Sequence, residues 1–214
     1  MPQRKTRRKY DNASRRQKRA ALGQRIAAAT AELHASQGPA ETSYTDIARQ
    51  AGVSLPTVYS HFPSEEALFQ SCTSHVAERA PALPLDEILE AEDLTAALEL
   101  LVMAMERQHR HYEPWLAWRM EGYIDTLAEM SARIRRQQSD LIARILARFL
   151  GKGPAKATIA GCETLLSFDC WHRLVRGHGL SFRAARKIVL QGMRSLIESP
   201  YKSPTSNHSR RHET

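Results

Sequence analysis

Between its two polar ends, this 214-residue chain repeats apolar residues at helical spacing almost everywhere. Leu22, Ile26, Ala29 and Leu33 form one such stripe, and residues three or four positions apart lie on one face of an α-helix. No convincing run of alternating β-branched residues competes with this pattern. Because 42% of the residues are hydrophobic, the chain can bury a real core. The sequence therefore predicts an all-α fold of about nine helices.

Glycines, prolines and capping residues divide the chain into helical segments. The first helix is expected from about Ser14 to Gln37, two short helices flank Gly52, and a fourth runs from Ser64 to about Ala80. Prolines 81 and 84 then open a linker that marks a domain boundary. Further helices are expected over 93–112, from Pro114, around 141–149, over 154–176 and over 181–198.

Residues 43–62, SYTDIARQAGVSLPTVYSHF, fit two short helices joined by a tight turn. Ser43 is a suitable N-cap for the first helix, with Asp46 in its first turn. Gly52 can adopt the positive φ that the turn needs. Ser54 is placed to cap the second helix. The spacing predicts a helix-turn-helix.

The second helix of this motif is expected to present a polar and aromatic face. Pro56 falls in its first turn, where the missing N–H costs little. Val53 and Val58 should pack the two helices together. An exposed face of this kind is what a helix needs to enter a DNA major groove. Its expected members are Leu55, Thr57, Tyr59 and His61.

At these residues the chain resembles the tetracycline-repressor family of transcriptional regulators. The family pattern is T-[ST]-x-x-D-I-A-x-x-A-G-V-S-x-x-T-[VL]-Y-x-H-F-x-S-x-E-x-L. The chain matches it without gaps over about 27 residues, at Thr42, Ser43, Asp46, Ile47, Ala48, Ala51, Gly52, Val53, Ser54, Thr57, Val58, Tyr59, His61, Phe62, Ser64, Glu66 and Leu68. The resemblance implies a helix-turn-helix head that binds duplex DNA, on a larger helical body that binds ligand and dimerises.

The resemblance also implies roles for single residues. Thr57 is expected at a base edge or thymine methyl, and Tyr59 and His61 at phosphates. Two departures matter: Pro56 and Glu65 stand where the family often has Gly and Lys, so Glu65 is not assigned to DNA. The candidate DNA-binding residues of the motif are Thr42, Ser43, Ser54, Leu55, Pro56, Thr57, Tyr59 and His61.

The N-terminal segment is strongly basic. Residues 1–25 carry ten Lys/Arg and one acid, a net +9, so the remaining residues sum to −1. Such a segment suggests a polyanionic partner. Alternatives are a solvated arm that aids solubility, or a binder of nucleic acid or membrane that works through the arm alone, without sequence preference. We expect the arm to add phosphate or minor-groove contacts, and assign Arg15, Arg16, Lys18 and Arg19 to DNA.

The predicted organisation has four parts. They are a basic, disordered arm over 1–15, a DNA-binding domain over 16–80, an effector-binding and dimerisation domain over 81–199, and a disordered tail over 200–214.

Two features of the body carry predictions about partners. The segment 154–198 is apolar with small residues, and we expect it to form a homodimer that matches a palindromic operator. The alternative is that it only completes the monomer core. A cluster of sulfur, aromatic and basic side chains is expected to bind a small-molecule effector, whose binding releases the DNA. An ordinary core stripe is the alternative for each of its members, Met103, His109, Tyr112, Trp115, Trp118, Arg119 and Tyr123.

Other classes of protein lack sequence support. We find no P-loop, HExxH, GxSxG or Rossmann pattern. We therefore expect neither an enzyme nor a cofactor, and the histidines lack convergent metal-ligand spacing. The three cysteines lack CxxC spacing and look like small buried hydrophobes. With no signal-peptide pattern or membrane span, we expect the protein in the cytoplasm. One structural alternative stays open for the motif, a helical hairpin in which Tyr59 and Phe62 are core aromatics.

Overall fold

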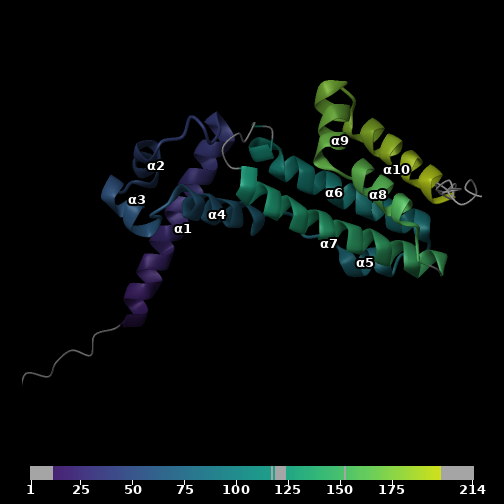
Figure 1. Cartoon of the computed structure of the whole chain (residues 1–214), viewed down its shortest axis with the longest axis horizontal. Helices are drawn as coiled ribbons and strands as arrows, with labels where there is room; N and C mark the ends of the chain where they lie inside the picture. The colour runs from purple at the N-terminus through teal and green to yellow at the C-terminus, as the bar shows by residue number, and fades with distance from the viewer. Residues whose placement is uncertain (1–11, 117, 119–123, 152, 199–214) are drawn as a thin grey trace, which may run out of the picture. The chain divides into compact units, whose positions relative to one another are not determined.

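The computed structural model describes residues 12–116, 118, 124–151 and 153–198. Within these ranges the chain is helical and contains no strand, which confirms the all-α prediction (Figure 1). Ten α-helices and one short π-helix occur there, one α-helix more than the predicted count. None of the described helices is both long and apolar enough to cross a membrane. Their bounds are α1 Asn12–Gln37, α2 Tyr44–Ala51, α3 Leu55–His61, α4 Glu65–Ala77, α5 Leu85–Leu89, α6 Leu94–Leu116, α7 Ile124–Leu150, α8 Lys156–Leu165, α9 Phe168–His172, η1 Arg173–Gly177 and α10 Phe182–Glu198.

The chain forms two compact units. The first, which we call the head, comprises Met1–Ala80 and His111–Thr126. The second, which we call the body, comprises Pro81–Arg110 and Leu127–Thr214. The head thus includes a segment that lies more than thirty residues farther along the chain.

The head is built around α1, which packs against α2 and α4, while α2 packs against α3. Ile26, Ile47 and Val58 are fully or almost fully buried at its centre, and Leu68 of α4 joins them. Leu22 and Leu33 pack against this cluster, as the apolar stripe of α1 predicted. The core is small, so the angle between α2 and α3 depends on few side chains.

The body has a larger core shared by α6, α7, α8 and α10. Leu98, Leu146 and Met193 are at most 1% exposed within it. Helices α8 and α10 approach each other closely at Gly161. A Cβ atom added to this glycine of α8 would lie only 2.7 Å from Leu196 Cδ1 of α10. A small residue of the segment 154–198 therefore allows α8 and α10 to pack closely.

Two predicted helix boundaries beyond residue 110 are wrong. Pro114 does not begin a helix but lies in the last turn of α6, where the Trp115 indole N–H donates to the Ala31 carbonyl at 2.7 Å and holds the turn. The predicted helix over 154–176 is interrupted after Leu165. Ser167 causes the break, because its hydroxyl donates to Thr164 O at 2.7 Å and accepts from the Cys170 N–H at 3.2 Å.

The cysteines differ in burial. Cys72 and Cys162 are buried, as predicted, whereas Cys170 is half-buried. Burial raises the pKa of the Cys72 and Cys162 thiols to about 11. Both therefore stay protonated and unreactive at neutral pH.

Candidate nucleic-acid interface

Helix α2 is fixed at both ends by its own residues. The Ser43 hydroxyl accepts a hydrogen bond from the Asp46 N–H at 3.1 Å, and the Asp46 carboxylate accepts from the Ser43 N–H at 3.3 Å. These reciprocal bonds form a capping box. Hydrogen bonds from the side chain and backbone of Ser43 lower the pKa of Asp46, and Arg49 adds to the shift. At the other end, Gly52 has φ +61°, so the predicted turn is confirmed.

Helix α3 follows that turn directly. Ser54 stands at its N-cap position, but its hydroxyl bonds the Thr57 hydroxyl at 2.7 Å rather than a backbone N–H. The predicted capping role of its side chain is therefore wrong. Pro56 lies in the first turn, as predicted. The Ser54 and Thr57 side chains hold each other in place, and Thr57 is half-buried.

One face of α3 is buried and the opposite face is open. Val58 is fully buried, whereas Tyr59 is 50% exposed and Pro56 is exposed. Tyr59 is therefore not a core aromatic. Leu55 was expected to face outward, but it is half-buried and packs against the head core. It lies three residues before Val58, so the two share a helix face.

Tyr59 is supported by an aromatic neighbour that is absent from the predicted DNA-binding residues. Its ring stacks on that of Tyr44, with centroids 4.6 Å apart and an angle of 8° between planes. Tyr44 is the first residue of α2, so the stack joins the two helices of the motif. The signal available in the sequence was an aromatic residue directly after the N-cap Ser43. This stack limits the positions that Tyr59 can take on the surface.

A hollow of about 320 Å³ opens beside this stack. Thr42, Ser43, Tyr44 and Tyr59 line it, and so does Glu65. The Thr42 hydroxyl already donates to Gly38 O at 2.7 Å, and the Ser43 hydroxyl lies 2.5 Å from the Asp46 carboxylate. Their hydroxyl protons are therefore engaged within the head. The sequence predicts that Thr42 and Ser43 place either their hydroxyls or the start of α2 against the DNA backbone, and these hydroxyls have no proton left to donate to a phosphate.

The basic residues near the N-terminus lie on a helix. Residues 1–11 of the predicted arm lie outside the described residues, and α1 already begins at Asn12. Arg15, Arg16 and Lys18 are exposed on it. Arg19 Nη2 donates to Ser60 O at 3.1 Å and so joins α1 to the end of α3. The cations of α1 therefore lie in the same unit as the exposed face of α3.

His61, at the end of α3, is half-buried. Burial, and secondarily the nearby charge of Arg19, lower the pKa of its imidazole. At neutral pH the ring is uncharged. A phosphate next to this ring would raise its pKa and so oppose the effect of burial.

The predicted effector residues are spread over both units. In the body, Met103 is 41% exposed, whereas His109 is buried with Nε2 2.9 Å from Leu166 O. In the head, Trp115 binds Ala31 O, and Trp118 donates to Ala35 O at 3.3 Å. Tyr112 is half-buried, and burial raises the pKa of its phenol. Arg119 and Tyr123 lie outside the described residues. The described members therefore belong to two units, Met103 and His109 to the body and Tyr112, Trp115 and Trp118 to the head.

The head matches a known family of regulators. Residues 26–72 match the model of the bacterial regulatory proteins of the tetR family. The head therefore carries a domain that is similar to that of tetR-family regulators. The matched range covers the C-terminal part of α1 from Ile26, all of α2 and α3, and α4 as far as Cys72. The stretch that carried the sequence resemblance falls within it.

A curated relative supports the same assignment. An uncharacterised HTH-type transcriptional regulator of Mycobacterium tuberculosis (strain CDC 1551 / Oshkosh) is 36% identical over 90 residues, which is 42% of this chain. The match covers 46% of that regulator, so the chain spans less than half the length of the curated relatives it matches.

Solved structures share the fold over most of the chain. A transcriptional regulator from Rhodococcus sp. Rha1 has a TM-score of 0.64 at 18% identity, covering 82% of this chain and 96% of that one. The SmeT–triclosan complex has a TM-score of 0.58 at 18% identity, covering 90% of this chain and 100% of that one. The helix-turn-helix head and helical body are therefore those of TetR-like regulators.

Proposed function

We propose that this chain is a sequence-specific regulator of transcription of the tetR family that binds duplex DNA through the open face of α3. The observation that carries the proposal is the placement of Tyr59, half-exposed and stacked on Tyr44, in a domain that matches the family. Residues 16–80 are the proposed DNA-binding domain, and 81–199 the proposed effector-binding and dimerisation domain. A rigid, exposed side chain on a short helix suits contact with a groove.

Within this proposal, Thr57 reads bases while Tyr59 and the α2 N-terminus contact phosphates. Pro56 and Ser54 would lie against the DNA at the start of α3, and Arg15, Arg16, Lys18 and Arg19 would supply phosphate contacts. Leu55 serves the head core and is not expected to contribute to specificity, because its side chain packs inward.

The chain is further proposed to act as a homodimer through residues 154–198. The exposed surface of α8 and α10 carries Ala157, Ala160 and Ile188, and Ile188 is 45% exposed. Small and apolar exposed residues suit close packing against a second copy. A two-fold protein presents two α3 helices, which fits a palindromic operator with half-sites about 34 Å apart.

The regulatory mode we propose is repression that an effector relieves. The structural neighbour SmeT is described in complex with triclosan, and a small-molecule effector in the present chain is an inference by analogy. Effector and operator would then weaken each other's binding reciprocally, by about 1–3 kcal/mol of coupling free energy.

Selection of bound fragments from random duplex DNA tests the DNA-binding proposal. The full-length protein should enrich a two-fold symmetric consensus whose half-sites lie about one helical turn apart. Enrichment without a consensus, at physiological salt, would contradict the proposal and favour a binder that works through its basic segment alone.

The regulatory mode needs a separate experiment. Labelled operator is titrated with the protein in the presence and absence of candidate small molecules. A compound that weakens operator binding supports relief of repression, while a broad panel without any effect on affinity argues against it.

A further inference from the structure

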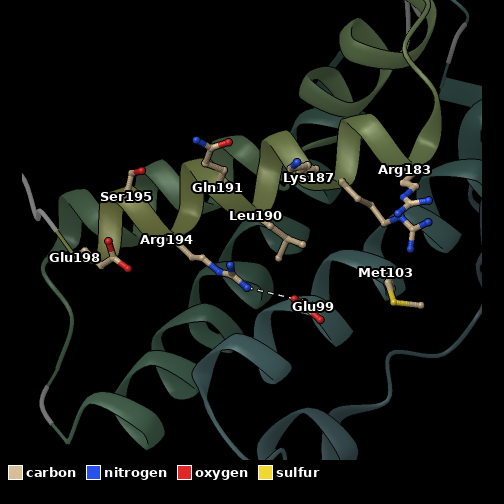
Figure 2. Close-up of a pocket in the computed structure, with 10 residues that line it drawn as sticks. Glu99, Met103, Arg183, Lys187, Leu190, Gln191, Arg194, Ser195 and Glu198 are labelled. Atoms are coloured by element: carbon tan, nitrogen blue, oxygen red, sulfur yellow. Dashed lines mark hydrogen bonds and ion pairs between the residues drawn. The ribbon is translucent and has the colours of Figure 1, made fainter.

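A charged groove on the body takes no part in the DNA contacts proposed for the head. It has a volume of about 670 Å³ and lies along α10, with α6 contributing Glu99 and Met103 (Figure 2). Both helices contribute from within the body, so the groove belongs to one unit. Its α10 residues fall within the segment 154–198 that we propose to dimerise, but Ala157, Ala160 and Ile188, the residues proposed to pack against a second copy, do not line it. Its volume falls within the range of about 300–1,000 Å³ that is typical of small-molecule sites.

The charges in the groove favour an anion. Four of the lining side chains are cationic and two are anionic. Arg194 Nη2 is paired with Glu99 Oε1 at 3.2 Å, and Arg186 Nε lies 2.9 Å from the buried Glu106. Arg183 and Lys187 are exposed, and the second carboxylate of the lining, Glu198, lies toward the opposite end of α10 from Arg183. The two exposed cations give the groove an excess of positive charge.

Two guanidinium groups have hydrogen-bonding capacity left over. The Nε atoms of Arg186 and Arg194 are buried and have no hydrogen-bond partner among the described residues. Arg186 Nε is near enough to Glu106 for an ion pair, but its alignment does not make a hydrogen bond. Because these two atoms are buried and not open to the groove, the exposed Arg183 and Lys187 are the cations available to a ligand.

The order of side chains along the groove indicates how the charged and apolar parts of a ligand would be arranged. Figure 2 shows Arg183 near Met103 at one end, Leu190 and the Arg194–Glu99 pair in the middle, and Ser195 and Glu198 at the other end. Arg183 and Arg194 are eleven residues apart on one helix, or about 16 Å. Apolar surface from Met103 and Leu190 therefore lies next to the cationic end.

We propose that this groove binds an amphipathic organic anion. Its carboxylate or phosphate group lies at Arg183 and Lys187, and its short apolar part covers Met103 and Leu190. Of the seven predicted effector residues, Met103 lines this groove. The inference rests on the proposed function in one respect, because it identifies the bound anion as the class of effector.

Calorimetric titration of the full-length protein without DNA tests the site. The probes are octanoate and octyl phosphate, with 1-octanol as the uncharged molecule of the same length. At least one anion should bind saturably with about tenfold or higher affinity than 1-octanol. Equal affinity for 1-octanol and both anions, or no saturable binding, would overturn the proposal.

A pair of matched double variants locates the site. R183Q/K187Q should weaken binding of the preferred anion by about tenfold or more, because both charges near its head are removed. R135Q/R136Q removes the same two charges from exposed positions of α7 and should stay within about twofold of the unmodified chain. All four side chains are exposed, so folding is not at risk. Equal affinities of the two variants would place the anion elsewhere and overturn the assignment.

The proposed effector role and the proposed DNA binding can be contradicted separately. If the anion binds at the groove but leaves operator affinity unchanged, the groove is not the effector site and the identification as effector is wrong. If no operator is selected, the calorimetric result still decides whether the groove binds anions.

Discussion

The α2–α3 pair and the α6–α10 groove show two different ways of positioning polar groups. In the pair, polar side chains bind partners three residues away, as Ser43 does with Asp46 and Ser54 with Thr57. In the groove, the partners lie far apart in the sequence, since Arg194 and Glu99 are 95 residues from each other. The surface we propose for DNA thus depends on local sequence, whereas the surface we propose for ligand depends on tertiary packing.

This difference explains which part of the chain can be recognised in relatives. A short sequence pattern encodes the caps and the turn that orient α3. The family match covers this pattern and ends within α4. The groove has no such pattern, because its geometry follows from how α6 and α10 pack in the body core. The solved neighbours share the whole fold at 18% identity, which leaves ample freedom for body side chains to differ.

The largest expected effect comes from truncating the core of one unit at a time. Ile47→Ala should cost about 2–5 kcal/mol of stability, because Ile47 is 1% exposed in the head core. It should abolish operator binding and leave octanoate binding in place. Chemical denaturation and the two binding assays measure this.

Leu146→Ala is the matched variant in the body, where Leu146 is fully buried. It should cost a similar amount and weaken octanoate binding. If each variant impairs both activities equally, the two surfaces are not separately supported and the comparison fails.

Acid should weaken the head through His34. Burial lowers the pKa of this imidazole to about 4, from 6.5, so between these values the unfolded chain binds a proton that the folded head does not. Stability is therefore full above about pH 6.5 and falls by about 1–3 kcal/mol as the pH drops toward 4. Denaturation midpoints at pH 7 and pH 4.5 measure the loss.

His34→Leu should reduce that loss, while His178→Gln, at an exposed position of the body, should not. Burial also lowers the pKa of His109 in the body, so part of the acid sensitivity remains in either variant. An undiminished loss in His34→Leu would show that the head does not titrate through this residue.

Removing a helix cap should have a smaller effect. Ser43→Ala should cost about 1 kcal/mol, since it deletes half of the capping box. It should also raise the pKa of Asp46 toward its ordinary value, because the Ser43 hydrogen bonds lower it. NMR titration of the Asp46 carboxyl checks this.

Ser64→Ala serves as the control, because Ser64 caps α4 through the Ala67 N–H at 3.2 Å. It should lose comparable stability without altering Asp46 or operator specificity. If both variants change operator specificity alike, the local cap of α2 has no special part in orienting α3.

The smallest effect on stability is expected for exposed cations of α1. Replacing Arg15, Arg16 and Lys18 together by Gln should change the free energy of unfolding by less than about 0.5 kcal/mol. It should reduce the slope of log affinity against log salt by about 0.9 for each DNA phosphate that the protein no longer neutralises. Binding titrations at several salt concentrations measure the slope, and an unchanged slope would remove these residues from the interface.

Local signals in the sequence predicted the motif well. Ser43, Gly52 and Pro56 each act within one helical turn, so their positions and the burial of Val58 could be predicted without the rest of the chain. Leu55 was wrongly predicted to face outward. In a helix of two turns few residues define the buried face, and which of them are buried depends on how α1 and α4 pack nearby.

Features that arise from packing were harder to predict, both in the body and in the segment of the head around Pro114. Pro114 continues α6 because Trp115 can reach a carbonyl of α1, a contact across 84 residues. The break at Ser167 depends on its hydroxyl competing for backbone groups, a local effect that the apolar pattern hides. The groove joins α6 to α10 through pairs that no spacing rule links, so the sequence indicated Met103 without its neighbours.

The open face of α3 is proposed to confer sequence preference, and a ratio of affinities tests this most directly. Binding to the selected duplex and to a scrambled duplex is measured at one salt concentration for the unmodified chain and for T57A/Y59A. We predict that the unmodified chain prefers the selected duplex by about 10³-fold or more. The double variant should lose most of that preference, while its affinity for scrambled DNA should fall only by the loss of the Tyr59 phosphate contact. A double variant that keeps the full preference would contradict the proposed role of α3.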